Sequence, residues 1–130
     1  AASDVYKRQS LPPIIKAKKI QKKASKKGFD WKETIDVIKK VEEELTELKH
    51  EIQQNNEKKS QEELGDLLFS IINLSRHLKV DASEAINQAN HKFVKRFSLM
   101  EEEISKNAKE MDNLTSEELE EFWVKIKLHE

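Results

Sequence analysis

Residues 61–78 decide the fold, and they read QEELGDLLFSIINLSRHL. Apolar side chains recur along this stretch at steps of three and four, and together they cover most of a helical circumference. They are Leu64, Leu67, Leu68, Phe69, Ile71, Ile72, Leu74 and Leu78. A helix that is apolar around so much of its surface is predicted to be central and buried. Gly65 within it costs ~1 kcal/mol relative to Ala, which indicates that another helix approaches closely there.

Two helices are expected before this central segment. The first starts with a pair of prolines after Ser10 and ends at Gly28, a residue suited to a helix C-terminus. The second is capped by Asp30 or Thr34 and carries one apolar stripe at steps of three and four. The polar residues 53–60 form the loop that follows. Because this connection is short, the helices on its two sides are expected to be antiparallel neighbours.

Two helices are expected after the central segment, because residues 81–84 and 115–118 both have the pattern of a capping box. The chain is therefore predicted to be an all-α antiparallel bundle of four to five helices, forming one domain over residues 10–130. Residues 1–9 lack the helical period and are predicted to be a disordered tail or a remnant of expression or sequence assembly.

Composition excludes several classes of function. The 24 Lys and Arg residues are balanced by 25 Asp and Glu residues, so the basic excess of a nucleic-acid-binding protein is missing. The absence of cysteine excludes a disulfide framework, a thiolate metal site and a cysteine nucleophile. No apolar run approaches the ~20 residues of a membrane span, and no signal peptide is evident. These features predict a cytoplasmic protein with neither a nucleic-acid nor a membrane partner.

A polar stripe follows one face of the central helix. Glu63, Asp66, Ser70 and Asn73 occur at i, i+3, i+7 and i+10, which places them on the same side. Because the other faces are apolar, this stripe is expected to face into the bundle. Carboxylates in such a position need cations or hydrogen-bond donors, since an isolated buried charge is expensive.

The second helix supplies a matching pair of carboxylates, Glu44 and Glu47. These residues precede the polar loop by about as many positions as Glu63 and Asp66 follow it, so an antiparallel hairpin brings the two pairs together. Four clustered carboxylates repel one another unless a divalent metal ion lies between them. Ligation by oxygen alone favours Mg²⁺ or Mn²⁺ over Zn²⁺. Taken alone, the spacing of Glu44 and Glu47 is more typical of a solvated face of a Glu-rich helix.

A pair of cations follows on the next helix. Lys92 and Arg96 are spaced i, i+4 and flank Phe93, so they share one face. Arg suits bidentate contacts with phosphate and Lys suits a point-charge contact. Without the carboxylates, both residues would be interpreted as ordinary surface cations.

These residues lie in segments that resemble the MazG nucleoside triphosphate pyrophosphohydrolases. The segments are LPP (11–13), IQKKA (20–24), GFDW (28–31), EELTE (43–47), ELGDLLF (63–69), NLSRHL (73–78) and NHKFVKRF (90–97). The resemblance is to the C-terminal, catalytically active domain of the two-domain members and covers residues 11–128. The family signature, E-x-x-E followed by a spacer and E-x-x-D, corresponds here to Glu44-x-x-Glu47 and Glu63-x-x-Asp66.

The resemblance implies a tight α-helical homodimer that hydrolyses nucleoside triphosphates to the monophosphate and pyrophosphate with Mg²⁺. It assigns metal binding to the four signature acids, Glu44, Glu47, Glu63 and Asp66. It assigns contacts with the triphosphate to Lys92 and Arg96, and further polyphosphate or metal-water contacts to Lys59 and Glu62. It places Trp123 in the nucleotide pocket, although a tryptophan at such a position is more often part of a hydrophobic core.

Several alternatives stay open at this point. The expected chemistry is attack of water on the α-phosphorus, with Glu43, Glu47 or Glu62 as the general base. A related but narrower dUTP- or dCTP-type pyrophosphatase would have the same scaffold. A non-catalytic helical dimerisation module would leave the acidic stripe merely solvated. Dimerisation is also expected because the central helix is more apolar than two neighbouring helices can easily cover.

Overall fold

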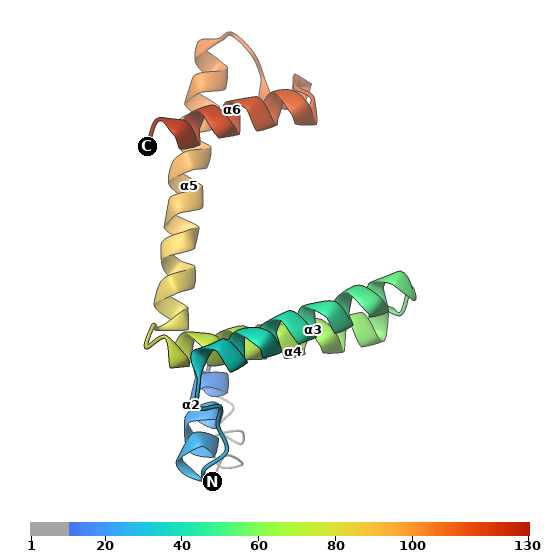
Figure 1. The fold of residues 1–130 in the computed structure, drawn as a ribbon. Coiled ribbons are helices and arrows are strands. Elements are labelled where there is room, and N and C mark those ends of the chain that lie inside the picture. The colour runs from blue at the N-terminus through green and yellow to red at the C-terminus, as the bar shows by residue number, and fades with distance from the viewer. Residues whose placement is uncertain (1–10) are drawn as a thin grey trace. The chain divides into compact units, whose positions relative to one another are not determined.

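The computed structural model describes residues 11–130, so the predicted tail, residues 1–9, lies outside the described residues. The elements are α2 (Pro13–Lys26), α3 (Thr34–Gln53), α4 (Glu57–His77), α5 (Ala82–Lys106), η1 (Met111–Asn113) and α6 (Ser116–Leu128) (Figure 1). Over the described residues these are five α-helices and one short 3₁₀ helix, with no strand, which confirms the all-α prediction. No helix within this described part is both long and apolar enough to cross a membrane.

The helices form two compact units, one ending at Glu84 and the other beginning at Ala85. The first unit contains α2, α3 and α4. The second contains α6 and nearly all of α5.

The ends of α2 and α3 show where local sequence signals succeed and where they fail. Gly28 has a φ of +90°, and the N–H groups of Gly28 and Phe29 donate to Ser25 and Ala24. This is a Schellman ending of α2, in which glycine provides the left-handed residue. The predicted caps of α3 are wrong, because Glu33 occupies the N-cap position without a side-chain hydrogen bond.

The connection between α3 and α4 is shorter than the sequence predicts. Helix α3 continues to Gln53, and α4 already begins at Glu57 because the Asn56 side chain caps it by accepting a 3.0 Å hydrogen bond from Lys59 N–H. Asn is among the preferred N-cap residues, so the polar run 53–60 contains a helix start as well as a turn. The tight connection lays α3 and α4 side by side as an antiparallel pair (Figure 1).

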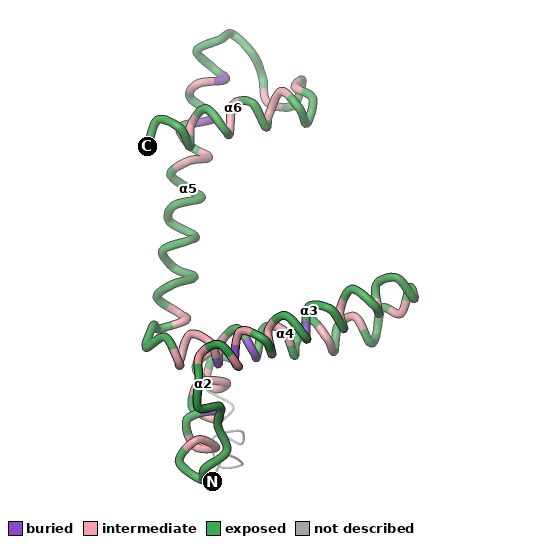
Figure 2. The backbone as a smooth tube through the Cα atoms, viewed as in Figure 1, coloured by how far each residue is buried: buried purple, intermediate pink, exposed green. Residues whose placement is uncertain are grey.

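Helix α2 packs against α4, and the buried residues of the first unit lie where α2, α3 and α4 meet (Figure 2). Most of them are polar: they are Gln21, Val37, Glu44, Ser70 and Asn73. A seam that buries so many polar groups is unusual for a structural core and points to a site.

The prediction that α4 is buried on most of its surface is wrong for the single chain. Leu64, Leu68 and Ile71 are between 44% and 53% exposed. The physical reason is that α2 and α3 contact the polar stripe of α4, which buries Ser70 and Asn73 and leaves the opposite apolar surface uncovered.

The second unit has a small apolar core of its own, which includes Met100 and Ile104. Helix α6 begins with the predicted capping box, in which Thr115 accepts from Glu118 N–H and the Glu118 carboxylate accepts from Thr115 N–H. The rings of Phe93 on α5 and Trp123 on α6 pack with centroids 5.3 Å apart.

Candidate metal centre

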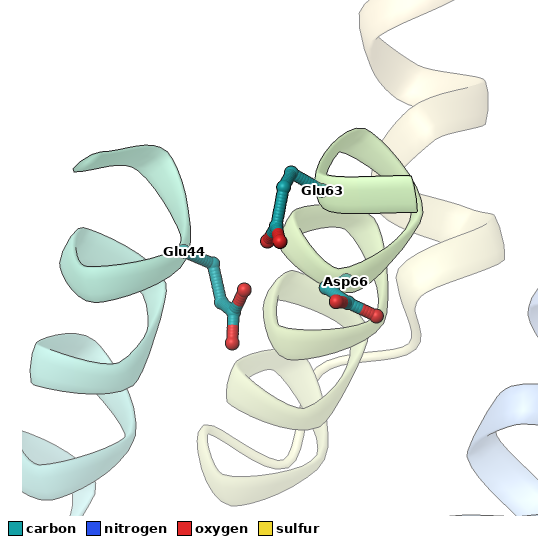
Figure 3. A group of neighbouring side chains, drawn as sticks. All are labelled: Glu44, Glu63 and Asp66. Carbon is teal, nitrogen blue, oxygen red and sulfur yellow. The ribbon is translucent and has the colours of Figure 1, made fainter. Parts of the chain in front are cut away.

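Three of the four predicted acidic residues come together between α3 and α4. Glu44 on α3 and Glu63 and Asp66 on α4 each offer a carboxylate oxygen, and these oxygens lie within 4.8 Å of one another. Glu44 and Glu63 turn toward each other from facing helices (Figure 3). The i, i+3 spacing of Glu63 and Asp66 puts both on the side of α4 that meets α3.

The cluster is short of hydrogen-bond donors. Glu44 is buried, and its Oε1 accepts from Lys40 Nζ at 2.9 Å, one helical turn earlier on α3. The other oxygen of Glu44 and the Oε2 of Glu63 are buried with no partner among the described residues. Buried carboxylate oxygens without partners are costly, so this arrangement calls for an additional positive group.

The electrostatics of Glu63 reflect the same shortage. Burial raises the pKa of Glu63 to about 7, and the neighbouring carboxyl groups of Glu47, Asp66 and Glu44 act in the same direction. Glu47 therefore lies beside Glu63, although it is outside the group of three converging ligand atoms.

A hard divalent cation fits this donor set. The converging groups are all carboxylates, and the two unpartnered oxygens belong to residues on different helices. Mg²⁺ and Mn²⁺ prefer oxygen ligands and are commonly held by a few carboxylates plus water and substrate oxygens. A cation here would satisfy the buried oxygens and remove the repulsion that raises the pKa of Glu63.

A second charged cluster lies at the other end of α4. Asp30 Oδ1, in the segment between α2 and α3, accepts from Arg76 Nη2 at 2.7 Å and from His77 Nε2 at 2.8 Å. Arg76 also donates through Nε and Nη2 to Asn73 Oδ1, at 3.1 and 2.8 Å. The hydrogen bond from Arg76, reinforced by His77, lowers the pKa of Asp30 to about 2. These bonds anchor the segment after Gly28 to α4.

A cavity of about 460 Å³ adjoins the carboxylates within the first unit. Glu44 and Asp66 are among its lining residues. Its other walls include the aromatic side chains Phe29 and Trp31 and the amide of Gln21. The carboxylates and a largely apolar recess therefore form one continuous site.

The remaining predicted site residues are exposed or paired elsewhere. Lys59 and Glu62 are exposed on the first turns of α4. In the second unit, Lys92 is exposed, whereas Arg96 forms an ion pair with Glu130 through two hydrogen bonds. Trp123 packs on Phe93, as described above. The predicted contacts of these five residues with a substrate remain predictions.

Three features of the site were missed from the sequence. Lys40 had a signal, since it precedes Glu44 by four residues and i, i+4 Lys–Glu pairs are common on helices. Asp30 was interpreted as a cap of α3 because its partners are separated from it by more than forty positions. Gln21 had no signal as a single amide on a Lys-rich helix.

Residues 32–98 match the MazG nucleotide pyrophosphohydrolase domain, and this span contains all three converging carboxylates. A relative from Thermotoga maritima, named nucleoside triphosphate pyrophosphohydrolase/pyrophosphatase MazG, is 47% identical over 117 residues, covering 90% of this chain and 45% of the relative. A relative from Escherichia coli K12, named nucleoside triphosphate pyrophosphohydrolase, is 40% identical over 124 residues, covering 94% of this chain and 47% of the relative. The chain thus spans about half the length of these curated relatives.

Proposed function

The chain belongs to the MazG nucleotide pyrophosphohydrolase family, and from this premise we propose that it hydrolyses nucleoside triphosphates to the monophosphate and pyrophosphate with Mg²⁺. The observation that carries the proposal is the convergence of Glu44, Glu63 and Asp66, with two carboxylate oxygens buried and without a partner in the part of the chain that the structure describes. Mn²⁺ is the alternative ion, because its ligand preferences are similar. The names of the two relatives describe the same reaction class.

In this proposal the three carboxylates hold the cation between α3 and α4. When bound, a divalent ion polarises a phosphoryl oxygen and lowers the pKa of a coordinated water. Lys40 fixes the orientation of Glu44 through their 2.9 Å contact, and hydrogen bonding to Glu44 raises the pKa of Lys40, so the lysine stays charged. A positive charge beside the cluster limits its repulsion without occupying the ligand position.

A carboxylate beside the three ligands would accept the proton of the attacking water. Glu47 lies beside Glu63, whereas Glu43 forms an ion pair with Lys40 at 3.5 Å. Glu62 is not among the described groups that act on the pKa of Glu63. We therefore favour Glu47 over Glu43 and Glu62 as the general base. The family signature instead makes Glu47 a fourth metal ligand. The assignment of triphosphate contacts to Lys92 and Arg96 rests on the sequence resemblance.

A homodimer is part of the proposal. The exposed apolar stripe on α4, formed by Leu64, Leu68 and Ile71, is regularly spaced at i, i+4 and i+7. A second copy of the chain would cover such a stripe by symmetric helix packing. Light scattering of the parent and of Leu68→Lys should give a dimer and a monomer; a monomeric parent would contradict the proposal.

The proposed substrate class also indicates the compartment in which the enzyme acts. Free nucleoside triphosphates favour a cytoplasmic enzyme, and the balance of 24 basic and 25 acidic residues gives no support for a nucleic-acid substrate. A narrower dUTP- or dCTP-type specificity is the alternative within the same chemistry.

The experiment that tests the reaction is product analysis. The purified chain is incubated with Mg²⁺ and a panel of ribo- and deoxyribonucleoside triphosphates, and pyrophosphate and orthophosphate are measured separately. Asp66→Asn serves as the control for contaminating enzymes. Pyrophosphate and monophosphate from the parent alone would support the proposal. Orthophosphate as the first product would place the cleavage elsewhere, and no product in any condition would favour a non-catalytic helical module.

A further inference from the structure

We propose that the Glu130 carboxylate competes with the triphosphate for Arg96: it binds the guanidinium group when no nucleotide is present and has to leave before a phosphate group can bind there. This inference rests on the proposed function, in which Lys92 and Arg96 contact the triphosphate. It concerns the second unit alone, and it makes Glu130 a residue that lowers the affinity for substrate.

Arg96 and Glu130 are joined by two hydrogen bonds. Arg96 Nε donates to Glu130 Oε1, and Arg96 Nη2 donates to Glu130 Oε2 at 2.8 Å. Each carboxylate oxygen therefore meets its own N–H group, in the forked arrangement with which arginine also binds phosphate. The Arg96 side chain is only 17% exposed, so little of it is left accessible to a second anion. Glu130 thus occupies a group that the proposed function assigns to the triphosphate.

Three basic residues of α5 act on the Glu130 carboxylate, and we call them the α5 cluster: Lys92, Lys95 and Arg96. The hydrogen bond from Arg96 is the largest cause that lowers the pKa of Glu130, and the charges of all three residues add to it. Their spacing, i, i+3 and i+4, places them on one side of α5. The carboxylate therefore lies where the same charges would attract a phosphate group.

The two competing anions differ in charge. A carboxylate carries one negative charge, whereas a triphosphate carries several and can contact more than one member of the α5 cluster at the same time. The triphosphate is therefore expected to displace Glu130. Its apparent affinity is proportional to the fraction of molecules in which Arg96 is free, so the competition appears as weaker binding.

Glu130 can leave Arg96 without disturbing α6. It lies two residues after Leu128, the last residue of the helix, and its backbone N–H donates to the Lys127 carbonyl at a long 3.5 Å. The Glu130 side chain is 40% exposed, and ion pairs in such positions contribute little to stability because water screens them. The contact can therefore open and close while the helix stays folded.

The kinetic test removes the charge of the competitor. Glu130→Gln keeps the size of the side chain, and the exposed Glu121→Gln on α6 is the matched control, since it makes the same change in net charge. With the best nucleotide of the panel and excess Mg²⁺, we expect KM to fall about threefold in Glu130→Gln, the effect of one exposed ion pair, with kcat unchanged. Glu121→Gln should keep the parent KM. An unchanged KM in Glu130→Gln would overturn the inference. A raised KM would overturn it as well, by showing that Glu130 positions Arg96 for the substrate.

A binding test examines the competition without the reaction. Inorganic tripolyphosphate is titrated calorimetrically, in the absence of divalent ions, into the parent, Glu130→Gln, Arg96→Met and the double variant. We expect Glu130→Gln to bind about threefold more tightly than the parent, and we expect this gain to vanish in the Arg96→Met background. Equal affinities of the parent and Glu130→Gln, no binding by any of the proteins, or a gain that persists without Arg96 would each overturn the inference.

The inference and the proposed reaction can fail separately. Tighter tripolyphosphate binding by Glu130→Gln, without pyrophosphate release from any nucleotide by the parent, would support the competition and refute the reaction. Pyrophosphate release by the parent, with equal tripolyphosphate affinity in the parent and Glu130→Gln, would support the reaction and overturn the inference.

Discussion

The two halves of α4 place carboxylates in opposite electrostatic environments. The first half contributes Glu63 and Asp66 to a cluster whose third member, Glu44, is also acidic, and whose one ion pair with a basic side chain, among residues 11–130, is the contact of Glu44 with Lys40. The second half contributes Arg76 and His77, which together surround the single carboxylate of Asp30. The pKa of Glu63 is accordingly raised to about 7, whereas that of Asp30 is lowered to about 2.

This difference separates a part of the helix that stabilises the fold from a part suited to chemistry. A carboxylate matched by donors adds to the free energy of unfolding, while carboxylates crowded together subtract from it in the absence of a cation. Structural networks and functional sites both perturb pKa values, but the direction of the shift distinguishes them here.

The largest expected effect is on turnover. Asp66→Asn removes one ligand charge and should lower kcat by at least about a hundredfold, since even residues that merely support metal ligands are worth 10–100-fold. The measurement is pyrophosphate release at saturating nucleotide and Mg²⁺. Asp30→Asn, measured alongside, should lose far less. Equal losses in the two variants would remove the functional distinction between the halves of α4.

The next effect concerns stability. Asp30→Asn should lower the free energy of unfolding by about 2 kcal/mol, because hydrogen bonds to charged groups contribute ~1.5–3 kcal/mol each and the side chain is partly exposed. Urea unfolding measures the loss. Asp112→Asn, an exposed aspartate on the short 3₁₀ helix, is the control and should change little. A loss in the control as large as in Asp30→Asn would contradict a structural role for the anchored segment.

A smaller effect of opposite sign is expected in the acidic cluster. At pH 8, above the pKa of Glu63, Glu63→Gln should raise the melting temperature of the metal-free protein, because a neutral amide removes the repulsion between the Glu63 carboxylate and those of Glu44, Glu47 and Asp66. It should also reduce the further rise that Mg²⁺ produces in the parent. The exposed Glu42→Gln on α3 is the matched control. A metal-free Glu63→Gln protein less stable than the parent would show that the acid is structural.

The smallest effects are in the pH dependence, and the two clusters should differ in both sign and range. Folded Glu63 holds a proton up to about pH 7, while the unfolded chain releases it near pH 4.5, so this group favours the folded state at low pH and its contribution falls as pH rises toward 7. Asp30, with a pKa of about 2 against 3.8 unfolded, contributes above pH 3.8 and loses that contribution as pH falls toward 2.

Metal-free unfolding curves between pH 2 and 8 measure both contributions. Glu63→Gln should flatten the profile between about pH 4.5 and 7, and Asp30→Asn should flatten it between about pH 4 and 2. A slope of the same sign in both windows would be inconsistent with the opposite pKa shifts.

The sequence predicted helices well because their signals are local. The period of α4, the ending at Gly28 and the capping box at Thr115 depend on residues within one or two turns. The meeting of Glu44 with Glu63 and Asp66 was also predictable, since a short connection between two helices fixes which turns face each other.

Other features depend on contacts that a linear pattern does not contain. The bonds of Asp30 to Arg76 and His77 cross more than forty positions, and Gln21 faces the carbonyl of Phe69 across a similar interval. The burial of α4 was overestimated for a different reason. Periodicity states which surface is apolar, but it does not state whether the same chain covers that surface.

The exposed stripe of Leu64, Leu68 and Ile71 has a consequence for how this protein should be handled. If a second copy covers these side chains, part of the folding free energy comes from association and depends on protein concentration. Dilution then acts as a denaturant: the melting temperature should fall as the sample is diluted below the dissociation constant. Melting temperatures of variants should therefore be compared at one fixed protein concentration.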